Sequence, residues 1–351
     1  MRTSAFAAVA LLAGSVLVAC GSGASGDGGD LQNAKVAFLM PDLASTRYEL
    51  QDKPLFEARM KQLCQSCQVI YQNADSDAAK QQQQANSALA QGVKAIVLDP
   101  VDSAAAATIV KSAQAQQVPI IAYDRPIPAT PADYYVSFDN EKIGAMIAQS
   151  LVDHLKTEQA EGGILQVNGS PTDAAAGLIK KGVHSAVDSS GFELLAEYDT
   201  PGWQPELAQS WVSGQITQFK DKIVGVVAAN DGTGGGSISA FKAAGVKVPP
   251  ITGNDAETAA AQRIITGDQF NTISKPIKIV AEASANVAWE FMQGKKPGGK
   301  ATLYNTPSEL FVPTVVTKDN IKQVLFDSGI MKAADVCTGE YAKGCGELGI
   351  K

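Results

Sequence analysis

The sequence predicts an α/β protein of two lobes, each a doubly wound parallel sheet with helices on both faces. Three observations support this prediction. Short, continuously apolar segments such as residues 119–123 are typical of parallel strands, which are covered on both faces. These segments alternate with longer helical ones, and the alternation restarts beyond Pro131 with a similar period. Polar residues directly follow several apolar segments, which is where open α/β sheets hold their ligands.

The first run of elements leads from Lys35 to Asp124. It contains four expected strands, at residues 35–40, 69–72, 95–98 and 120–123. A helix that ends near Gln65 separates the first two strands, and Ala-rich helices separate the others. The turn at residues 73–77 carries several residue types that cap the start of a helix. Because the connections are short, this run predicts one compact lobe.

The second run leads from Tyr134 to Thr252. Its expected strands lie at residues 134–138, 164–167, 192–197, 224–229 and 251–252. Its expected helices lie at residues 141–156, 173–189, 205–219 and 232–244. The two runs follow each other without a long linker, so we expect the boundary to be a short hinge segment near residues 125–133.

The N-terminus is typical of an exported lipoprotein. The apolar segment 5–18 overlaps Leu17-Val18-Ala19-Cys20, which resembles a lipoprotein processing site. The segment is too short and too rich in alanine for a good membrane-spanning helix. The residues that follow are rich in Gly, Ser and Asp, which suits a flexible tether. We therefore expect a signal peptide over residues 1–20, lipidation of Cys20 and a tether over residues 21–32.

Composition and charge exclude several classes of function. The chain has 351 residues, 45% of them hydrophobic, with 29 basic and 36 acidic side chains. Removal of the leader takes away Arg2, so the processed chain would carry 28 basic and 36 acidic residues and a net charge of −8. Nucleic acid is not an expected partner of such a chain, which has no basic stripe. His154 and His184 have no second ligand at metal spacing, so no metal site is expected.

The cysteines other than Cys20 form two pairs that are close in sequence, Cys64 with Cys67 and Cys337 with Cys345. In an exported protein, such pairs predict two disulfides. The spacing of the first pair is also that of a redox motif, but a thioredoxin-like site lies between a strand and a helix, whereas this pair follows a helix. Zinc bound by all four cysteines is an alternative only if the two ends of the chain meet.

Asp124 and Arg125 end the central strand, where a small polar molecule would be held. An Asp accepts hydrogen bonds and an Arg donates several from a rigid fork, so the pair suits vicinal hydroxyls. A salt-bridged loop without a ligand is the alternative. Trp203 lies in the loop 201–205, where no helical stripe accounts for a large aromatic residue, so it is a candidate site residue. The alternative interpretation of Trp203 is ordinary packing within the loop.

The glycine-rich segment 231–237 follows a strand and opens a helix, as a dinucleotide-binding fingerprint does. However, Ser237 occupies the third glycine position, and no acidic residue follows a next strand at the required distance. We therefore expect a tight turn that exposes backbone near a ligand, and no nucleotide or other cofactor.

Six motifs, in order along the chain, resemble the D-xylose-binding proteins of bacterial sugar ABC transporters. They are Tyr123-Asp124-Arg125, the segment 135–144, Gly169-Ser170-Pro171-Thr172-Asp173, Gly202-Trp203, Ala229-Asn230-Asp231 and Ser274-Lys275-Pro276. The resemblance extends from about Val36 to Val316 and implies the type I periplasmic-binding-protein fold, with two lobes joined by a three-stranded hinge. The N-terminal lobe would comprise residues 33–125 and 276–310, and the C-terminal lobe residues 126–275 and 311–351.

The resemblance implies a set of sugar contacts, and the chemistry of the residues agrees with it. The implied contacts are Arg47, Asp124, Arg125, Asp173, Trp203, Asn230, Asp255 and Lys275. A flat indole at Trp203 suits the apolar C–H face of a pyranose ring, and Tyr48 is expected to cover the opposite face. The chain departs from the family at residues 174–176, which follow Asp173. These residues are alanines here, whereas the xylose-binding proteins carry asparagines after the corresponding aspartate. This departure leaves open whether the ligand is D-xylose, a related pentose or hexose, or a polyol.

The implied function is binding without catalysis. The chain would be a lipid-anchored, extracytoplasmic and monomeric protein that delivers a monosaccharide to an ABC importer, with a permease and its ATPase as partners. The alternative is a sugar sensor that presents its closed form to a signalling receptor. A sugar hydrolase is a further alternative, because Asp124, Asp173 and Asp255 could supply catalytic carboxylates. However, the sequence does not place any two of them at the separation that hydrolysis needs. A repressor would need a DNA-binding segment where this chain has a leader and a tether.

Overall fold

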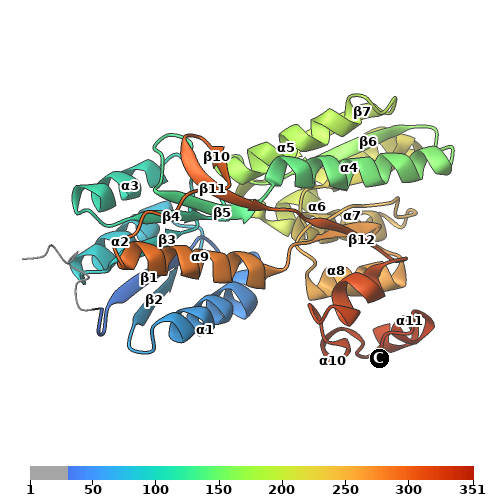
Figure 1. Cartoon of the computed structure of the whole chain (residues 1–351). Coiled ribbons are helices and arrows are strands. Elements are labelled where there is room, and N and C mark those ends of the chain that lie inside the picture. Colours follow the sequence, from blue (N-terminus) through green and yellow to red (C-terminus); the bar gives the residue numbers. More distant parts are fainter. Residues whose placement is uncertain (1–30) are drawn as a thin grey trace, which may run out of the picture.

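The structure is a computed structural model that describes residues 31–351. The predicted leader, Cys20 and residues 21–30 of the predicted tether lie outside the described residues. Figure 1 shows two lobes side by side, the first containing β1 to β5 and the second containing α4 to α8. Within residues 31–351, no helix combines the length and the hydropathy that a membrane span needs.

The first lobe is built on a seven-stranded sheet in the order β10-β11-β5-β4-β3-β1-β2. Every neighbouring pair is parallel except β10 with β11. The strands are β1 (Lys35–Met40), β2 (Gln68–Asn73), β3 (Ala95–Leu98), β4 (Ile120–Tyr123), β5 (Tyr134–Phe138), β10 (Ala301–Leu303) and β11 (Thr306–Phe311).

Helices cover both faces of this sheet, which explains why its strands are continuously apolar. On β1, Phe38 and Met40 pack into the core that contains α1 and α9, whereas Leu39 points into the core under α2 and α3. A π-helical turn, η1, precedes α1. The segments are η1 (Tyr48–Asp52), α1 (Lys53–Leu63), α2 (Ala78–Ala90), α3 (Ala106–Ala115) and α9 (Ile277–Met292).

The hydrogen bonds of β5 correct the predicted lobe boundary. The boundary at residue 126 assigned residues 134–138 to the second lobe, but β5 pairs in parallel with both β4 and β11 of the first sheet. Residues 125–133 therefore connect two strands of one sheet and are not the hinge. A buried strand has the same apolar pattern in either sheet, so the sequence rhythm does not distinguish the two assignments.

The second lobe has a parallel sheet in the order β7-β6-β8, with α4 and α5 packed together and α6 and α7 packed together. On β8, Val227 joins the core that contains α4 and α5, while Val226 joins the core of α6 and α7. Ile251 forms only an isolated bridge to Val226 in place of the expected strand. The elements are α4 (Asn140–Thr157), β6 (Gly163–Asn168), α5 (Ala174–Val187), β7 (Glu193–Asp199), α6 (Pro205–Phe219), β8 (Ile223–Ala228) and α7 (Asp231–Ala244).

A smaller unit completes the second lobe. Strands β9 and β12 form an antiparallel pair, and α8, α10 and α11 surround a separate apolar cluster that includes Ile264, Val316 and Cys345. No pattern in the sequence predicted α8, β9 or the β10–β11 hairpin. The elements are α8 (Thr258–Thr266), β9 (Asn271–Ser274), β12 (Thr314–Thr317), α10 (Ala333–Val336) and α11 (Tyr341–Glu347), and a second π-helical turn, η4 (Lys322–Asp327), lies between β12 and α10.

The chain passes between the lobes three times, from β5 to α4, from β9 to α9 and from β11 to β12. These three crossings form the hinge that the resemblance implied. In the structure the second and third crossings lie side by side, because β9 and β12 pair directly with each other.

The glycine-rich segment has a different role from the one expected. Its glycines lie inside α7, where a Cβ on Gly234 would approach the Thr252 carbonyl oxygen to 2.7 Å and one on Gly236 the Pro205 carbonyl oxygen to 2.2 Å. Gly234 and Gly236 therefore let the helix pack closely against neighbouring backbone, a role that the sequence did not predict.

The two cysteine pairs are both disulfide-bonded, Cys64 to Cys67 and Cys337 to Cys345. Cys67 packs against the core of the first lobe, whereas Cys345 lies in the cluster around α8. Because the pairs belong to different lobes, they do not form one four-cysteine site. In the part of the chain that the structure describes, no three His, Cys, Asp or Glu side chains are arranged to hold a metal ion.

Candidate functional site

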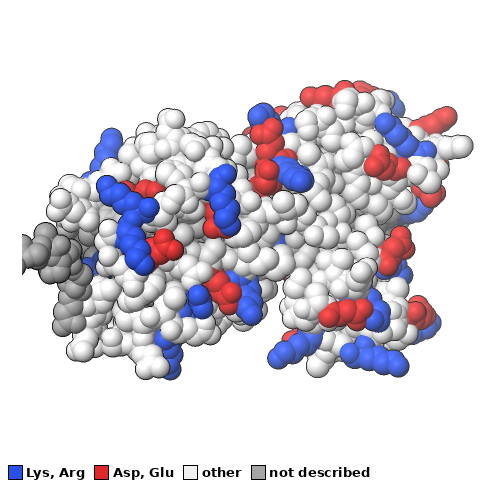
Figure 2. Space-filling model, in the orientation of Figure 1, with Lys and Arg blue, Asp and Glu red and all other residues white. Residues whose placement is uncertain are grey.

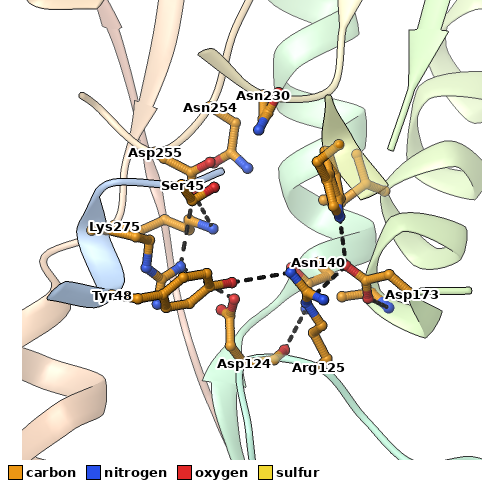
Figure 3. A pocket seen from close by; sticks show the side chains of 14 residues that line it. Ser45, Tyr48, Asp124, Arg125, Asn140, Asp173, Asn230, Asn254, Asp255 and Lys275 are labelled. Carbon is orange, nitrogen blue, oxygen red and sulfur yellow. Dashed lines mark hydrogen bonds and ion pairs between the residues drawn. The ribbon is translucent and has the colours of Figure 1, made fainter. Parts of the chain in front are cut away.

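A polar pocket lies between the lobes, at the carboxyl ends of their parallel strands (Figure 3). Its space amounts to about 380 Å³, including the part that is open to solvent. All nine residues that the sequence predicted to bind a ligand line it: Arg47, Tyr48, Asp124, Arg125, Asp173, Trp203, Asn230, Asp255 and Lys275. Five further residues line it as well: Ser45, Asn140, Ala175, Ile179 and Asn254.

Arg47 is oriented by Asp52, which the π-helical turn η1 brings back beneath it. The Arg47 Nε and Nη2 atoms donate to the two Asp52 carboxylate oxygens at 3.1 and 2.8 Å. The Tyr123 hydroxyl donates to the same carboxylate. The remaining nitrogen, Nη1, donates to Asp124 at 3.2 Å. Two nitrogens of the guanidinium therefore fix its position, and the third faces the pocket.

The charges around Asp124 keep it ionised. Burial by itself would raise the pKa of Asp124, but the positive charges of Arg47, Lys275 and Arg125 outweigh burial and hold that pKa below its ordinary value. Its backbone carbonyl accepts hydrogen bonds from the Tyr135 and Ser137 hydroxyls at 2.7 and 2.9 Å. Asp124 is thus a fixed hydrogen-bond acceptor at the base of the pocket.

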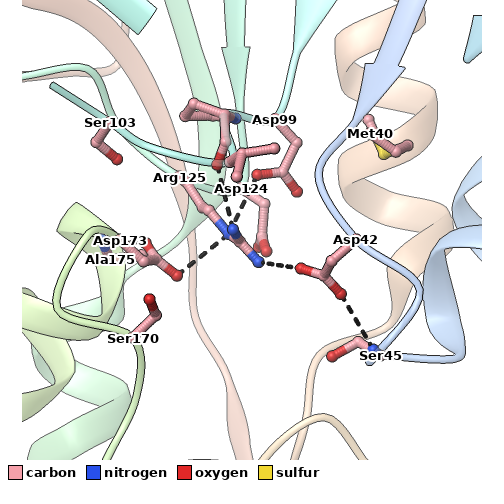
Figure 4. Close-up of polar contacts among 12 residues, drawn as sticks. Met40, Asp42, Ser45, Asp99, Ser103, Asp124, Arg125, Ser170, Asp173 and Ala175 are labelled. Atoms are coloured by element: carbon pink, nitrogen blue, oxygen red, sulfur yellow. Dashed lines mark hydrogen bonds and ion pairs between the residues drawn. The ribbon is translucent and has the colours of Figure 1, made fainter. Parts of the chain in front are cut away.

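Arg125 is surrounded by acceptors from both lobes (Figure 4). Its Nη2 donates to Asp42 at 2.8 Å and to the Tyr48 hydroxyl at 3.2 Å. Its Nη1 donates to the Pro100 carbonyl at 3.1 Å, and its Nε lies 3.1 Å from Asp173 of the second lobe. Most of the donor fork is therefore occupied by protein groups, so Arg125 acts mainly as an organiser of the pocket.

Asp99 is a buried acidic residue beside Arg125 that was not among the predicted site residues. It is fully buried, its nearest ion-pair contact is the Arg125 Nε at 3.4 Å, and within residues 31–351 neither of its oxygens accepts a hydrogen bond. Burial raises the pKa of the Asp99 carboxyl well above its ordinary value, although Arg125 opposes this effect. Burial therefore favours the protonated form of the Asp99 carboxyl beside the guanidinium.

Trp203 is held edge-on to Asp173. Its indole Nε1 donates to the Asp173 Oδ2 at 3.0 Å, while the Asp173 Oδ1 caps α5 by accepting from the Ala175 amide at 2.7 Å. Gly169 provides the room for the ring, since a Cβ there would lie 2.1 Å from the Trp203 Cη2. Burial raises the pKa of Asp173, with Arg125 opposing. Trp203 is also part of the hydrophobic core, so its site role and its packing role coexist.

Three pocket residues have backbone conformations that are uncommon for side chains other than glycine. Asp124 and Trp203 have φ values of 58°, and Asp255 has a φ of 103°. Such conformations cost free energy and persist where surrounding contacts enforce them, and they concentrate at functional sites. Their presence at three predicted positions supports a functional reading of this pocket.

Asp255, Lys275 and Asn230 line the pocket from the second lobe and the hinge. The Lys275 Nζ lies 2.7 Å from the Asp255 Oδ1, and the Arg47 Nη1 lies 3.9 Å from the same oxygen. Asn230 caps α7, its Oδ1 accepting from the Thr233 amide at 2.8 Å. Lys275 therefore both pairs with Asp255 and borders the pocket.

Some lining residues could have been found in the sequence and others could not. Asn140 follows β5, and Asn254 follows the strand-like segment at Ile251 and stands beside predicted Asp255, so the rule of polar residues after strands could have included both. Ser45 lies in a loop with no such signal. Ala175 and Ile179 are one helical turn apart on α5, and apolar helical residues ordinarily indicate core.

The arrangement can bind a small polyhydroxylated molecule. Charged acceptors and donors from both lobes line one part of the pocket, whereas Trp203, Ala175 and Ile179 supply apolar surface. Buried charges are costly unless they are paired, and hydroxyl groups can donate to a carboxylate while accepting from a guanidinium or an ammonium.

The comparisons with known proteins agree with this geometry. Residues 36–296 match the model of the periplasmic binding protein domain family. The chain is 33% identical to the D-xylose-binding periplasmic protein of Escherichia coli (strain K12) over 315 residues, which cover 87% of this chain and 93% of that protein. It is 30% identical to the multiple sugar-binding periplasmic receptor ChvE of Rhizobium radiobacter, covering 75% of this chain and 81% of that protein.

A solved structure has the same fold. The ABC transporter solute binding protein from Clostridium phytofermentans, which has β-D-glucose bound, superposes with a TM-score of 0.77 at 26% identity, covering 86% of this chain and 99% of that one. The matched proteins bind solutes and are not enzymes, and they act outside the cytoplasm. From the fold, the interlobe pocket and these matches together, the chain belongs to the periplasmic binding protein domain family, as a monosaccharide-binding protein of the ABC-type transporters.

Proposed function

We propose that this chain is a lipid-anchored solute-binding protein that delivers D-xylose, or a related pentose, hexose or polyol, to an ABC importer. One observation carries the proposal: nine residues chosen from the sequence converge from distant positions on one pocket between two lobes. Residues that only packed a core would have no reason to gather polar and charged groups at a shared cavity.

The proposed contacts divide by chemistry. Asp124 and Asp255 accept hydrogen bonds from sugar hydroxyls, and Arg47, Lys275 and Asn230 donate to them. Trp203 and Tyr48 pack against the C–H groups of the sugar ring. A sugar that lacked one of these hydroxyls would leave a buried charged group unpaired, which costs about 1–3 kcal/mol.

The wall formed by Ala175 and Ile179 affects which sugar fits. Both side chains are apolar, and Ala175 belongs to the alanines at 174–176 where the resembling xylose-binding proteins carry asparagines, so this side of the pocket suits C–H groups better than hydroxyls. D-xylose remains the first candidate, because the relative with 33% identity is described as D-xylose-binding. Relatives and neighbours described as binding multiple sugars or β-D-glucose widen the proposal to hexoses.

Delivery requires that the partner distinguishes a loaded protein from an empty one. A sugar that contacts both lobes stabilises the closed arrangement more than the open one, so its binding energy shifts the population towards closure. We propose that a permease, coupled to its ATPase, reads the closed form of a monomer. Lipidation of Cys20 would keep the protein at the membrane close to that permease.

A thermal-shift screen of the purified protein against pentoses, hexoses and polyols tests the ligand assignment. A ligand at a hundred times its dissociation constant should add about 2.7 kcal/mol of stability. If D-xylose gives the largest shift in melting temperature, D-xylose is supported as the ligand. If another sugar or polyol gives the largest shift, that compound becomes the proposed ligand and the proposed transport role is unchanged. The absence of any shift across the panel would overturn sugar binding.

The transport role and the anchor need separate tests. Deletion of the gene should abolish uptake of the labelled ligand, whereas retained uptake with a lost transcriptional response would favour the sensor. Cys20→Ser should release the protein from the membrane fraction, while Cys64→Ser should leave it there. If both variants stayed in the membrane fraction, lipidation at Cys20 would be contradicted.

A further inference from the structure

Residues 253–257, here called the Asp255 loop, present two pocket residues in a strained conformation. The loop leads from Thr252 to the start of α8 and carries Asn254 and Asp255, which both line the pocket. Asp255 has a φ of 103° and Ala256 a φ of 49°, so two consecutive residues lie outside the favoured backbone regions. Contacts from outside the loop must hold this conformation.

Asp231 supplies two of those contacts, at the Asn254 carbonyl and the Glu257 amide, although it does not line the pocket. Strand β9 supplies others, through Asn271, Thr272 and Ile273. Asp231 is the first residue of α7 and is completely buried. Its Oδ2 accepts from the Glu257 amide at 2.9 Å and from the Thr272 hydroxyl at 2.9 Å, and its Oδ1 accepts from the Gln269 Nε2 at 2.8 Å. All three donors belong to the segment that begins with the Asp255 loop and ends in β9.

The backbone of Asp231 makes two more contacts with the same segment. Its amide donates to the Asn254 carbonyl at 2.9 Å, and its carbonyl accepts from the Arg263 Nη2 at 2.8 Å. Gly253 lets the carboxylate approach, since a Cβ at that position would lie 2.0 Å from the Asp231 Oδ1. Neighbouring Asn230 lines the pocket, so Asp231 directly joins a pocket residue to the Asp255 loop.

We propose that Asp231 is a positioning residue for ligand binding, which fixes the Asp255 loop relative to Asn230 and so sets the place of Asn254 and Asp255 in the pocket. The inference rests on the proposed function, in which Asp255 and Asn230 contact the sugar. A displacement of about 1 Å in a binding group is enough to weaken its hydrogen bonds, so the loop must be held tightly.

The carboxylate at this position is not interchangeable with an amide. Three donors point at the two oxygens, and both oxygens of the side chain accept, two bonds at Oδ2 and one at Oδ1. In Asp231→Asn, the amide NH₂ faces the Gln269 NH₂ or the Glu257 amide, and one buried donor loses its partner. The side-chain amide of Gln269 cannot flip to present its oxygen to position 231, because its Oε1 accepts from the Arg263 Nε at 2.8 Å.

The test combines a readout without ligand and one with ligand, on Asp231→Asn and Asp231→Ala. In the free protein, amide hydrogen exchange should accelerate within residues 253–257. With D-xylose as the probe, or the most stabilising sugar of the panel if D-xylose gives no shift, the dissociation constant should rise about ten-fold or more. Ser237→Ala is the matched control, since Ser237 is buried in α7 and its hydroxyl donates to the Thr233 carbonyl within that helix.

A compensating exchange separates positioning from general destabilisation. In Asp231→Asn combined with Gln269→Glu, the amide at position 231 can donate to the carboxylate at position 269, which keeps its pairing with Arg263. The double variant should recover part of the lost affinity, although its contact with the Asn271 carbonyl is lost. Recovery would support positioning, because a merely unstable protein would not regain affinity by a second buried substitution.

Two results would overturn the proposal. One is unchanged hydrogen exchange over residues 253–257 in both single variants, and the other is wild-type affinity in both. If the wild-type protein bound no sugar of the panel, the proposed function would fail, but the exchange comparison would still decide whether Asp231 holds the loop.

Discussion

The Arg125 Nε lies 3.1 Å from the Asp173 Oδ2, and this ion pair joins the two lobes directly. Beside it, the Ser103 amide donates to the Thr172 carbonyl at 2.9 Å, and the Ser103 hydroxyl accepts from the Ala174 amide at 3.1 Å. Arg125 and Ser103 belong to the first lobe, and their partners belong to the start of α5 in the second. Such contacts require closed lobes, so they stabilise closure, and those of Ser103 do so from outside the pocket lining.

Replacement of Ser103 by Ala should therefore weaken binding from outside the pocket. The substitution removes an oxygen that caps α5, and a lost cap costs about 1 kcal/mol, or about five-fold in affinity. The loss falls on the closed form, so ligand dissociation should accelerate while association changes little. Stopped-flow measurement of both rates tests this. Ser213→Ala is the control, because its hydroxyl bonds within α6 on the surface, and equal dissociation rates in the two variants would argue against an interlobe role.

Trp203→Phe should lower affinity while keeping an aromatic ring in the pocket. The change removes the indole N–H that donates to Asp173 at 3.0 Å and leaves this buried carboxylate with fewer donors. Asp173 keeps its ion pair with Arg125, so we expect a loss of about ten-fold, from one hydrogen bond to a charged group that is worth about 1.5–3 kcal/mol. Titration calorimetry measures the effect. Trp211→Phe is the matched control because Trp211 stacks on Tyr198 away from the pocket, and an equal loss there would show that the effect is not local.

Gly169→Ala should displace Trp203 and weaken binding. A Cβ at Gly169 would lie 2.1 Å from the indole ring, so the ring must move out of its position against Asp173. Gly177→Ala provides the contrast, since a Cβ at this position in α5 meets no atom within 4 Å. Alanine is also the better helix former, so Gly177→Ala should bind normally with a slightly raised melting temperature. Normal binding by Gly169→Ala would contradict the role assigned to that glycine.

The free protein should lose stability as the pH rises through neutrality. Burial, followed by the charges of Asp231 and Asp255, raises the pKa of Glu257 to about 8, and burial, followed by Asp255, raises the pKa of Asp231 to about 7. A carboxyl whose pKa is raised by folding binds its proton more tightly in the folded state. Its stabilising contribution is therefore present below the ordinary carboxyl pKa and is lost as the pH rises through the folded value.

Glu257→Gln tests whether stability falls with rising pH because of these carboxyl groups. Because the substitution removes one of the two titrations, the melting temperature should fall less between about pH 6 and pH 9 than in the wild type. Glu347→Gln, at an exposed position near the C-terminus, should leave the wild-type slope unchanged. A wild-type melting temperature that increases over this range would show that the two carboxyls do not dominate the pH dependence.

Local patterns in the sequence were sufficient for most elements of the fold. Strands such as β3 and β4 are continuously apolar, and helices such as α4 begin after capping residues, so both kinds of element could be placed within a few residues. The nine predicted pocket residues came from strand-end positions and from a family resemblance, and all of them line one cavity. The disulfide partners were also predictable, because each pair is close in sequence.

The sequence by itself determined the two-lobed α/β class, the element order and the family, because these depend on local periodicity and short motifs. Only the tertiary structure decided which sheet β5 joins, why α7 is rich in glycine and how Asp231 holds the Asp255 loop. Strand pairing, close backbone packing and buried hydrogen bonds join residues that are distant in sequence, and no local pattern specifies such partners. The ion pair between Arg125 and Asp173 belongs to the same class, since it exists only when the two lobes meet.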